Sequence, residues 1–360
     1  MFAADEREQR LTCEPGQAPV AERANAQVPG HSDSVKVLFI GGSGRSGSTV
    51  VERLLGALPG VCNVGEVVLM WERGLLRGER CGCGVPLPEC PFWREVGDVA
   101  FGGWNAFNVP EFLALKRSVD RHRFIPRLLA GGGSGRRLLP ETATGRAARE
   151  YAAVYAQLYR AIQQVSGCAV VVDASKHASL AFCLRTEPAI DLRVMHLVRD
   201  PRAVAYSWTR PLKRPEAAGA APASPRYIPT MSPASSAMRW NIVNLELHLL
   251  TAQGTATRLI RYEDFIVAPV TGMRKLAGFV GVEPELSFMS DTGADLGRTH
   301  TAGGNPMRFS SGWIEFRRDD RWASQLRPVA RAQVTALTFP LLARYGYLRE
   351  PSGSHRQCAE

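Results

Sequence analysis

The 360-residue chain has little lysine and no long apolar run. Only five of its 44 basic residues are lysines, namely Lys36, Lys116, Lys176, Lys213 and Lys275. No stretch approaches the roughly 20 apolar residues that cross a bilayer, so we expect no membrane span. The first residues, Met1 to Glu8, lack the apolar segment of a secretory signal, which leads us to expect a cytoplasmic protein.

The overall composition excludes two further classes of protein. Hydrophobic residues make up 45% of the chain and charged residues 22%, which is too apolar for a disordered chain, and the glycines follow no fibrous repeat. The formal net charge of +10 suggests an anionic partner, without choosing between nucleic acid, lipid and a phosphorylated cofactor. An arginine surplus is also typical of GC-rich coding, so most of this charge need carry no functional message.

The chain divides into two expected tails and one expected folded domain. Residues 1–34 lack apolar periodicity and contain several prolines and glycines, which indicates a flexible tail. Residues 35–350 are expected to form the domain, and residues 351–360 a second tail. Within the domain, residues 209–237 are rich in proline and are expected to be a mobile loop. A lid over a cleft and a solvated insertion both remain open for this loop.

Short apolar runs alternate with helical patterns along the domain. Strands are expected at residues 35–40, 169–173, 192–198 and 257–262, and helices at residues 151–164, 179–185, 203–208 and 270–280. This alternation predicts an α/β fold of the P-loop type, with a parallel β-sheet flanked by helices on both faces. Ligands of such sheets bind beyond the carboxyl ends of the strands, so the polar residues that follow the strands should converge on one cleft.

A glycine-rich loop, Gly41-Gly-Ser-Gly-Arg-Ser-Gly-Ser-Thr49, lies between the first strand and a helical pattern. Glycines and a helix N-terminus let backbone N–H groups converge on an anion, so this context predicts a phosphate site. Gly42 and Gly47 have the spacing of the nucleotide-kinase loop, but Ser48 stands where that loop has its lysine. The cation is instead Arg45, which is poorly matched to β- and γ-phosphates.

Four motifs between residues 36 and 310 together resemble the sulfotransferase family that uses 3′-phosphoadenosine-5′-phosphosulfate (PAPS). Arg45-Ser-Gly-Ser-Thr49 is similar to the family's 5′-phosphosulfate loop, and Val198-Arg-Asp-Pro-Arg-Ala-Val-Ala-Tyr-Ser207 to its 3′-phosphate motif. Leu259-Ile-Arg-Tyr-Glu-Asp264 and Gly304-Asn-Pro-Met-Arg308 are similar to later elements of carbohydrate-type and bacterial members.

The resemblance implies a set of donor-binding residues. It assigns the 5′ end of PAPS to Gly44, Arg45, Ser46, Gly47, Ser48 and Thr49. It assigns the 3′-phosphate to Arg199 and Ser207, with Arg308 as a second clamp. Charge-assisted contacts from arginine suit both anionic ends. The alternatives are a tight turn without a ligand and an ordinary serine on a helix surface.

The resemblance also implies the catalytic groups. Gly65-Glu66 stands where tyrosylprotein and several bacterial sulfotransferases have a glutamate as base, and Lys176 is similar to the family's charge-neutralising lysine; Arg45 would assist. Surface roles for Glu66 and Lys176 stay open, as do His177 and His196 as bases, although a core role is favoured for His196. Asp173 either orients Lys176 or caps the next helix.

These assignments imply transfer of a sulfuryl group from PAPS to a hydroxyl, less readily an amine, of a small-molecule, glycan or lipid acceptor. The products would be a sulfate ester and 3′-phosphoadenosine-5′-phosphate (PAP), and no metal is required. Two alternatives are a small-molecule kinase with a degenerate loop and a basic nucleic-acid-binding protein. The arginines are scattered along the chain, which argues against nucleic-acid binding. Residues 71–149 are expected to be helical and irregular and to contribute to the acceptor pocket. The oligomeric state stays open.

Two further groups of residues have no settled role. Trp240, Asn241 and Asn244 follow the proline-rich loop, and packing is favoured over contact with acceptor or adenine. Cys81, Cys83 and Cys90 form a compact element for which free thiols, a redox-labile bridge and a metal site are alternatives. Cys62 would be a fourth ligand only if the fold brought it close, so we assign no metal ligand.

Overall fold

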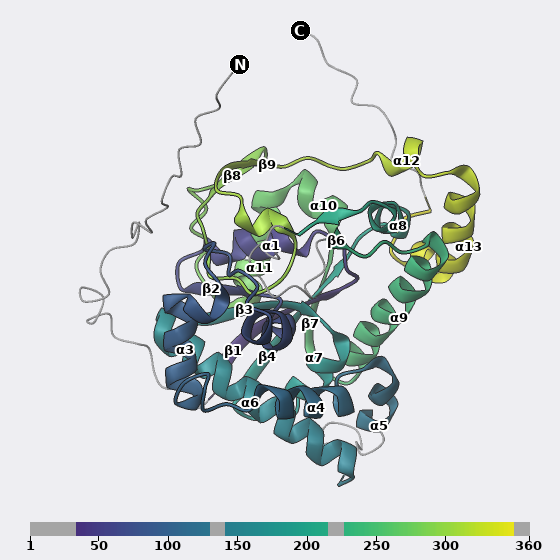
Figure 1. Ribbon diagram of the computed structural model, residues 1–360. Helices are drawn as coiled ribbons and strands as arrows, with labels where there is room; N and C mark the ends of the chain where they lie inside the picture. Colours follow the sequence, from purple (N-terminus) through teal and green to yellow (C-terminus); the bar gives the residue numbers. More distant parts are fainter. Residues whose placement is uncertain (1–33, 130–140, 215–226, 349–360) are drawn as a thin grey trace, which may run out of the picture. The chain divides into compact units, whose positions relative to one another are not determined.

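The computed structural model describes residues 34–129, 141–214 and 227–348 (Figure 1). The expected N-terminal tail, apart from Ser34, and the expected C-terminal tail at residues 351–360 lie outside the described residues. Of the proline-rich stretch, residues 215–226 also lie outside them. Its described parts form a small ladder, β5 (Leu212–Lys213) with β6 (Tyr227–Ile228), and the first turn of α9 (Pro233–Ala252).

A five-stranded parallel sheet forms the centre of the domain, in the order β2-β3-β1-β4-β7. Its strands are β1 (Val35–Gly42), β2 (Val61–Gly65), β3 (Val170–Lys176), β4 (Ile190–Val198) and β7 (Ala256–Arg261). Four of them coincide with the strands expected from apolar runs, which confirms the predicted parallel sheet. The strand β2 was not expected from the sequence, because this edge strand is only five residues long and carries a polar Asn63.

Side chains of β1 alternate between two apolar layers. Val35, Val37 and Phe39 face a core shared with α6 (Ala143–Ser166) and α7 (Ala178–Leu184). Leu38 and Ile40 face a second core, shared with α1 (Ser48–Gly56) and α11 (Pro269–Val280). Because successive side chains of a strand point to opposite faces, the two cores confirm that helices cover both faces of the sheet (Figure 1).

The described part of residues 71–149, which we expected to be helical and irregular, is largely helical, and its helices pack on α6. It contains a π-helix, Met70–Leu76, that follows α2 (Val67–Leu69). Trp71 lies at the centre of an aromatic cluster, with its ring 4.3 Å from that of Phe112 and 5.3 Å from that of Phe107. The remaining helices here are Leu87–Glu89, α3 (Pro91–Phe101), α4 (Val109–Val119), His122–Phe124 and α5 (Ile125–Leu129).

The described part of the C-terminal half of the domain adds five further helices or helical turns and one more small ladder. These are α8 (Pro201–Thr209), α10 (Tyr262–Val267), the ladder of β8 (Gly293–Leu296) with β9 (Gly312–Glu315), the turn Pro306–Phe309, α12 (Trp322–Gln325) and α13 (Pro328–Arg344). Within the described residues, no helix is both long and apolar enough to cross a bilayer.

Arg53 on α1 holds residues 297–310, a late segment of the chain, against this helix. Its side chain is 2% exposed. One terminal nitrogen donates to the carbonyl of Met307, and the other to the carbonyls of Gly297 and Ser310, over 2.6 to 3.1 Å. A guanidinium that satisfies three buried carbonyls is costly to remove, because each carbonyl then loses its donor.

We therefore expect Arg53→Ala to lower the free energy of unfolding by about 3 kcal/mol. Urea denaturation measures the change, and Arg117→Ala, which removes an exposed arginine of α4, is the matched control. Equal stability of the two variants would contradict this structural role for Arg53.

Candidate active site

The glycine-rich loop connects β1 to α1 at the carboxyl end of the sheet. Gly47 is the N-cap of α1, with φ 88°, a left-handed backbone that favours glycine. A Cβ atom at Gly47 would lie 2.2 Å from the ring of Tyr262, and one at Gly44 would lie 2.9 Å from Trp208. The rings of Tyr262 and Trp208 thus leave no room for a side chain at these two positions.

Ser46 provides a polar group that fits an anion. Its side chain is 1% exposed, and among the described residues none hydrogen-bonds its hydroxyl. Buried hydroxyl groups without a partner are rare in folded proteins. An oxygen atom of an anion held in the loop would accept the bond. Ser48, which is also buried, and the half-buried Thr49 add two hydroxyls at the same helix N-terminus.

Arg199 joins the end of β4 to the glycine-rich loop. Its guanidinium donates a hydrogen bond of 3.0 Å to the carbonyl of Arg45 and lies 4.9 Å from the centre of the Tyr262 ring. The Arg45 guanidinium lies 5.0 Å from the ring of Trp208 on α8. Ser207, the neighbour of Trp208, is half-buried on the same helix. The structure therefore brings the loop, Arg199 and the helix of Ser207 together, as the two motifs predict.

A cavity of about 440 Å³ lies on the other side of Arg199, between the ends of β4 and β7. Its walls include Tyr262, Trp322 and Tyr347 as well as Arg199 and Arg318. Five carboxylates also line the cavity, from Asp200, Glu263, Asp264, Asp319 and Asp320. The aromatic walls therefore suit a planar ring, whereas the carboxylates disfavour an anionic group inside the cavity.

Glu66 and Lys176 form an ion pair between the ends of β2 and β3. Lys176 Nζ lies 2.6 Å from Glu66 Oε1, and the two side chains are 12% and 18% exposed. The Lys176 ammonium also donates to the carbonyl of Ala174 at 2.9 Å. The pair is therefore largely enclosed but still reachable from solvent.

Arg45 lies within electrostatic reach of this pair. Burial lowers the pKa of the Arg45 guanidinium, and the Glu66 carboxylate partly offsets that effect. The loop and the ion pair thus form one site, in which Arg45, Glu66 and Lys176 meet at the carboxyl edge of three neighbouring strands.

Two backbone conformations mark the same site. Among the residues that the structure describes, only Arg45 (φ 71°) and Lys176 (φ 65°) combine a side chain with a positive φ. Such conformations cost about 1–3 kcal/mol each and cluster at functional sites, where the surrounding structure holds them. Both belong to the residues that the sequence analysis selected as catalytic.

Asp173 and Ser175 brace the turn that carries Lys176. The Asp173 carboxylate accepts hydrogen bonds from the Ser175 N–H, the Ser175 hydroxyl and the Tyr159 hydroxyl. Burial raises the pKa of Asp173 to about 6. The expectation that Asp173 caps the next helix is wrong, because the N-cap of α7 is His177 and its side chain makes no cap hydrogen bond.

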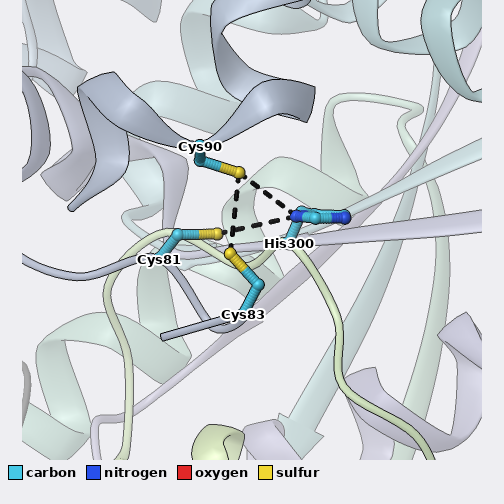
Figure 2. A group of neighbouring side chains, drawn as sticks. All are labelled: Cys81, Cys83, Cys90 and His300. Carbon is cyan, nitrogen blue, oxygen red and sulfur yellow. Dashed lines mark hydrogen bonds between the residues drawn. The ribbon is translucent and has the colours of Figure 1, made fainter. Parts of the chain in front are cut away.

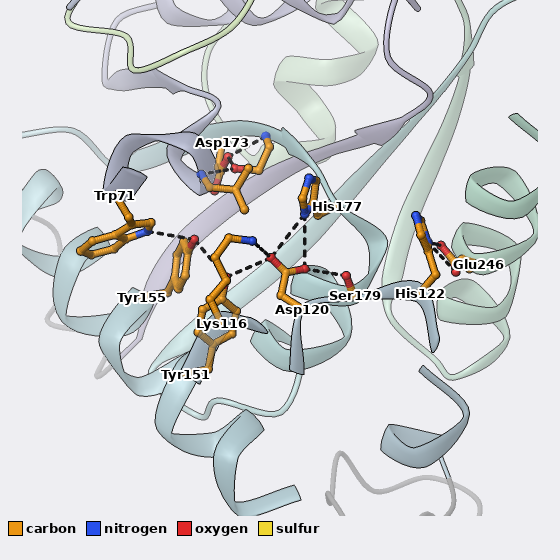
Figure 3. Close-up of polar contacts among 12 residues, drawn as sticks. Trp71, Lys116, Asp120, His122, Tyr151, Tyr155, Asp173, His177, Ser179 and Glu246 are labelled. Atoms are coloured by element: carbon orange, nitrogen blue, oxygen red, sulfur yellow. Dashed lines mark hydrogen bonds and ion pairs between the residues drawn. The ribbon is translucent and has the colours of Figure 1, made fainter. Parts of the chain in front are cut away.

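His177 belongs to a separate polar network around Asp120 (Figure 3). Its Nδ1 lies 3.3 Å from Asp120 Oδ2, and that carboxylate also pairs with Lys116 and accepts from the hydroxyls of Tyr151 and Ser179. Burial alone would raise the pKa of Asp120, but the charges of His177 and Lys116 hold it well below its usual range. His177 is thus held beside the site by a carboxylate and remains the alternative base.

His196, Trp240 and Asn244 are core residues. His196 is 1% exposed and lies 2.8 Å from the amide oxygen of Asn244, and burial lowers its pKa to about 4. Trp240 and Asn244 are fully buried, and the Trp240 ring donates to the carbonyl of Arg199. Asn241 donates to the carbonyl of Leu337. These four side chains therefore have packing roles, as favoured from the sequence.

Arg308 differs from the other expected donor-binding residues. Its side chain is 1% exposed, and its two terminal nitrogens donate to the carbonyls of Thr301 and Arg80 over 2.6 and 2.7 Å. The guanidinium therefore holds two backbone segments together. A clamp on a phosphate would have to give up these contacts, so we do not carry Arg308 into the donor site.

Glu52, a buried carboxyl next to the ion pair, was not among the residues predicted from the sequence. It lies on α1, is 3% exposed, and receives a hydrogen bond of 3.4 Å from Asn63. Burial raises the pKa of Glu52 to about 7; the charge of Lys176 lowers it and that of Glu66 raises it. A glutamate within the apolar run Val50–Leu58 was the one signal in the sequence that could have identified it.

Comparison with known proteins gives a family match and likenesses to solved structures, among them two sulfotransferase structures. The model of the sulfotransferase family matches residues 38–285. None of the curated proteins searched matches the chain. The sulfotransferase domain from the curacin biosynthetic pathway is 16% identical, with a TM-score of 0.45, over 86% of this chain and 98% of that one. The sulfotransferase from Alicyclobacillus acidocaldarius is 13% identical, with a TM-score of 0.33, over 86% and 94% of the two chains. With TM-scores below 0.5, neither likeness adds to what the family match shows.

The raised pKa of Glu52 predicts a pH-dependent effect of its amide variant. Folded Glu52 holds its proton up to about pH 7, whereas the unfolded chain releases it near pH 4.5, so stability falls as pH rises through this window. Glu52→Gln removes the cost and should raise the free energy of unfolding by about 3 kcal/mol at pH 8. The gain should shrink towards pH 5.

Urea denaturation of both proteins at the two pH values measures the effect. Glu95→Gln, at an exposed position of α3, is the matched control and should change neither value. A Glu52→Gln gain that is the same at both pH values would contradict a buried, protonated Glu52.

Proposed function

The chain belongs to the sulfotransferase family, and from this premise we propose that it is a PAPS-dependent enzyme that sulfates a hydroxyl group. The observation that carries the proposal is the ion pair of Glu66 and Lys176 beside the Arg45 loop. A proton acceptor, two cations and an anion-binding loop are the groups that sulfuryl transfer to an alcohol requires.

Two groups of residues would hold the two anionic ends of the donor. The loop at Gly44–Thr49 offers backbone N–H groups, the unpartnered Ser46 hydroxyl and the hydroxyls of Ser48 and Thr49 to the 5′ end. Arg199, with Ser207 on the facing helix, offers charge-assisted donors to the 3′-phosphate. The cavity beside Arg199 has aromatic walls, which suit stacking of the nucleobase between these ends.

Glu66, Lys176 and Arg45 would divide the chemistry between them. The donor supplies the sulfuryl group when it is bound. Glu66 takes the proton of the acceptor hydroxyl, whose oxygen then forms its bond to sulfur. Lys176 and Arg45 keep positive charge next to the oxygen atoms on which negative charge grows, within a partly enclosed site where such charges act strongly. The bond between sulfur and the 5′-phosphate oxygen of the donor would break as the new bond forms, and the products would be a sulfate ester and PAP.

The acceptor that we propose is a hydroxyl of a small molecule, glycan or lipid, and an amine is the less suitable nucleophile. Glu66 is 18% exposed, so an acceptor group can reach its carboxylate. Transfer of this kind needs no metal ion and no nucleic acid. We further propose a cytoplasmic location, where PAPS would be the available donor.

Binding of PAP tests the donor assignment directly. We expect micromolar binding by calorimetry, and Arg199→Ala should weaken it roughly tenfold or more, because a charge-assisted contact to phosphate is lost. Arg258→Ala, at an exposed position of β7, is the matched control. Tight ATP binding without a response to PAP would contradict the proposal and favour a kinase.

The role of Glu66 is tested with an acceptor found by screening a metabolite panel with labelled PAPS. Glu66→Gln keeps the size of the side chain but cannot take a proton, so kcat should fall by about 10²–10⁴-fold. The Kd for PAP of this variant should equal that of the parent protein. Glu72→Gln, which changes an exposed glutamate on the next helix, should keep full activity. Full activity of Glu66→Gln would move the base role to another group, with His177 as the next candidate.

A further inference from the structure

We propose that Cys81, Cys83, Cys90 and His300 bind one zinc ion as a structural site. The four ligand atoms all lie within 4.8 Å of one another. Cys90 and His300 are 210 residues apart in the sequence, yet their side chains point at a common centre (Figure 2). The fourth ligand is therefore His300 and not Cys62, which lies outside the group of four.

The distances among the four atoms fit a tetrahedral ion. Zinc–sulfur bonds of about 2.3 Å and zinc–nitrogen bonds of about 2.0 Å give tetrahedral edges of about 3.8 Å between sulfurs and about 3.5 Å between sulfur and nitrogen. The Cys83 and Cys90 sulfurs are 3.7 Å apart. Nδ1 of His300 lies 3.2 Å from the sulfur of Cys90 and 3.9 Å from that of Cys81. An ion fits between them with small side-chain adjustments.

The backbone holds the cysteine loop in this arrangement. The N–H of Cys81 donates to the carbonyl of Val85 at 2.8 Å, and that of Gly84 donates to the carbonyl of Cys81 at 2.9 Å. This tight turn places Cys81 and Cys83 on one side of the loop. Gly82 is required between them, because a Cβ atom there would lie 2.4 Å from the carbonyl oxygen of Thr299.

His300 is fixed from the other side by contacts that leave Nδ1 facing the sulfurs. Its ring stacks on Phe92 at 5.0 Å and 16°. Its carbonyl accepts from the ring N–H of Trp93 at 2.9 Å, and the next carbonyl, of Thr301, accepts from the N–H of Gly82 at 2.9 Å. A ligand set that neighbouring contacts hold in place is preorganised for a metal ion.

The donor set selects zinc over other common ions. Three thiolates and one imidazole suit a borderline-soft ion with tetrahedral geometry, whereas calcium and magnesium require oxygen ligands. Four protein ligands leave no open position, so the ion would be structural. A disulfide bond, with sulfurs about 2.05 Å apart, would use two thiols and leave the third thiol and His300 without a shared role.

The ion would join two segments that meet at β2. The segment of His300 continues to Ala302, whose N–H donates to the carbonyl of Val64 at 2.8 Å and whose carbonyl accepts from the N–H of Glu66 at 2.6 Å. The metal site therefore stabilises the backbone next to Glu66 without touching a reacting group. The inference does not depend on the proposed function.

Metal analysis of the full chain tests the site. Protein purified from zinc-supplemented cells without a metal-affinity step should contain about one zinc ion per chain by mass spectrometry. Cys83→Ala and His300→Ala should lose most of the zinc, whereas Cys62→Ala, a cysteine outside the cluster, and His122→Ala should keep it. Removal of the ion by a chelator should lower the melting temperature.

A cobalt experiment on the parent protein keeps the test decisive if the variants do not fold. The zinc-free chain refilled with Co²⁺ should show the visible bands of tetrahedral cobalt and a thiolate-to-cobalt charge-transfer band. A parent protein that contains no zinc and gives no such spectrum would overturn the proposal. Loss of zinc in Cys62→Ala equal to that in Cys83→Ala would also overturn it. PAP binding is a separate measurement, so failure of the zinc site and failure of the proposed function are distinguishable.

Discussion

The ion pair between Glu66 and Lys176 is the contact on which the arrangement of the site depends. It closes the gap between the ends of β2 and β3 at 2.6 Å, with both side chains largely buried. Loss of either partner would leave the other charge enclosed without compensation, which is expensive in a protein interior. The pair in turn requires the left-handed backbone at Lys176 and the Asp173 and Ser175 hydrogen bonds that support it.

The neighbouring Glu52 sets the charge around this pair. Burial keeps its pKa near 7, so below that pH it remains protonated and adds no negative charge. Arg45 and Lys176 then face the Glu66 carboxylate without a further charge from Glu52. Asp173, whose pKa burial raises to about 6, is another carboxyl that interacts with Lys176. An anion bound at the loop would therefore meet one negative charge fewer. A neutral buried carboxyl thus supports anion binding by its lack of charge.

The sequence predicted the parts of the fold that depend on local pattern. Four apolar runs became β1, β3, β4 and β7, and the loop with Arg45 lies where a strand–loop–helix unit requires it. The edge strand β2 escaped prediction because a five-residue segment with an internal Asn63 has no clear periodicity. His300 could not be linked to the cysteines, since tertiary structure alone brings together residues so distant in sequence.

Arginine shows most clearly why composition could not locate the site. Arg53 and Arg308 are buried and donate hydrogen bonds to backbone carbonyls. A guanidinium, with five N–H donors in a fixed plane, suits this role. Arg202 pairs with Asp200 beneath the ring of Trp322. Arg45 and Arg199 differ from these three because they lie at the glycine-rich loop. The surplus of basic residues therefore combines structural arginines with those that we propose face a ligand, and only their positions in the fold separate the two groups.

The segment at residues 297–310 follows the region that matches the family model, yet it determines where Glu66 lies. Arg53 holds it from α1, Arg308 holds it to Arg80, and Ala302 pairs with Gly65 next to the proposed base. The loop after β1 and the motif after β4, which we propose bind the donor, are each continuous in sequence, and this explains why sequence patterns find them. The surroundings of Glu66 are built by contacts between distant segments, so their geometry is a property of the folded chain. A change in this late segment would therefore act on the proposed chemistry mainly through the position of Glu66.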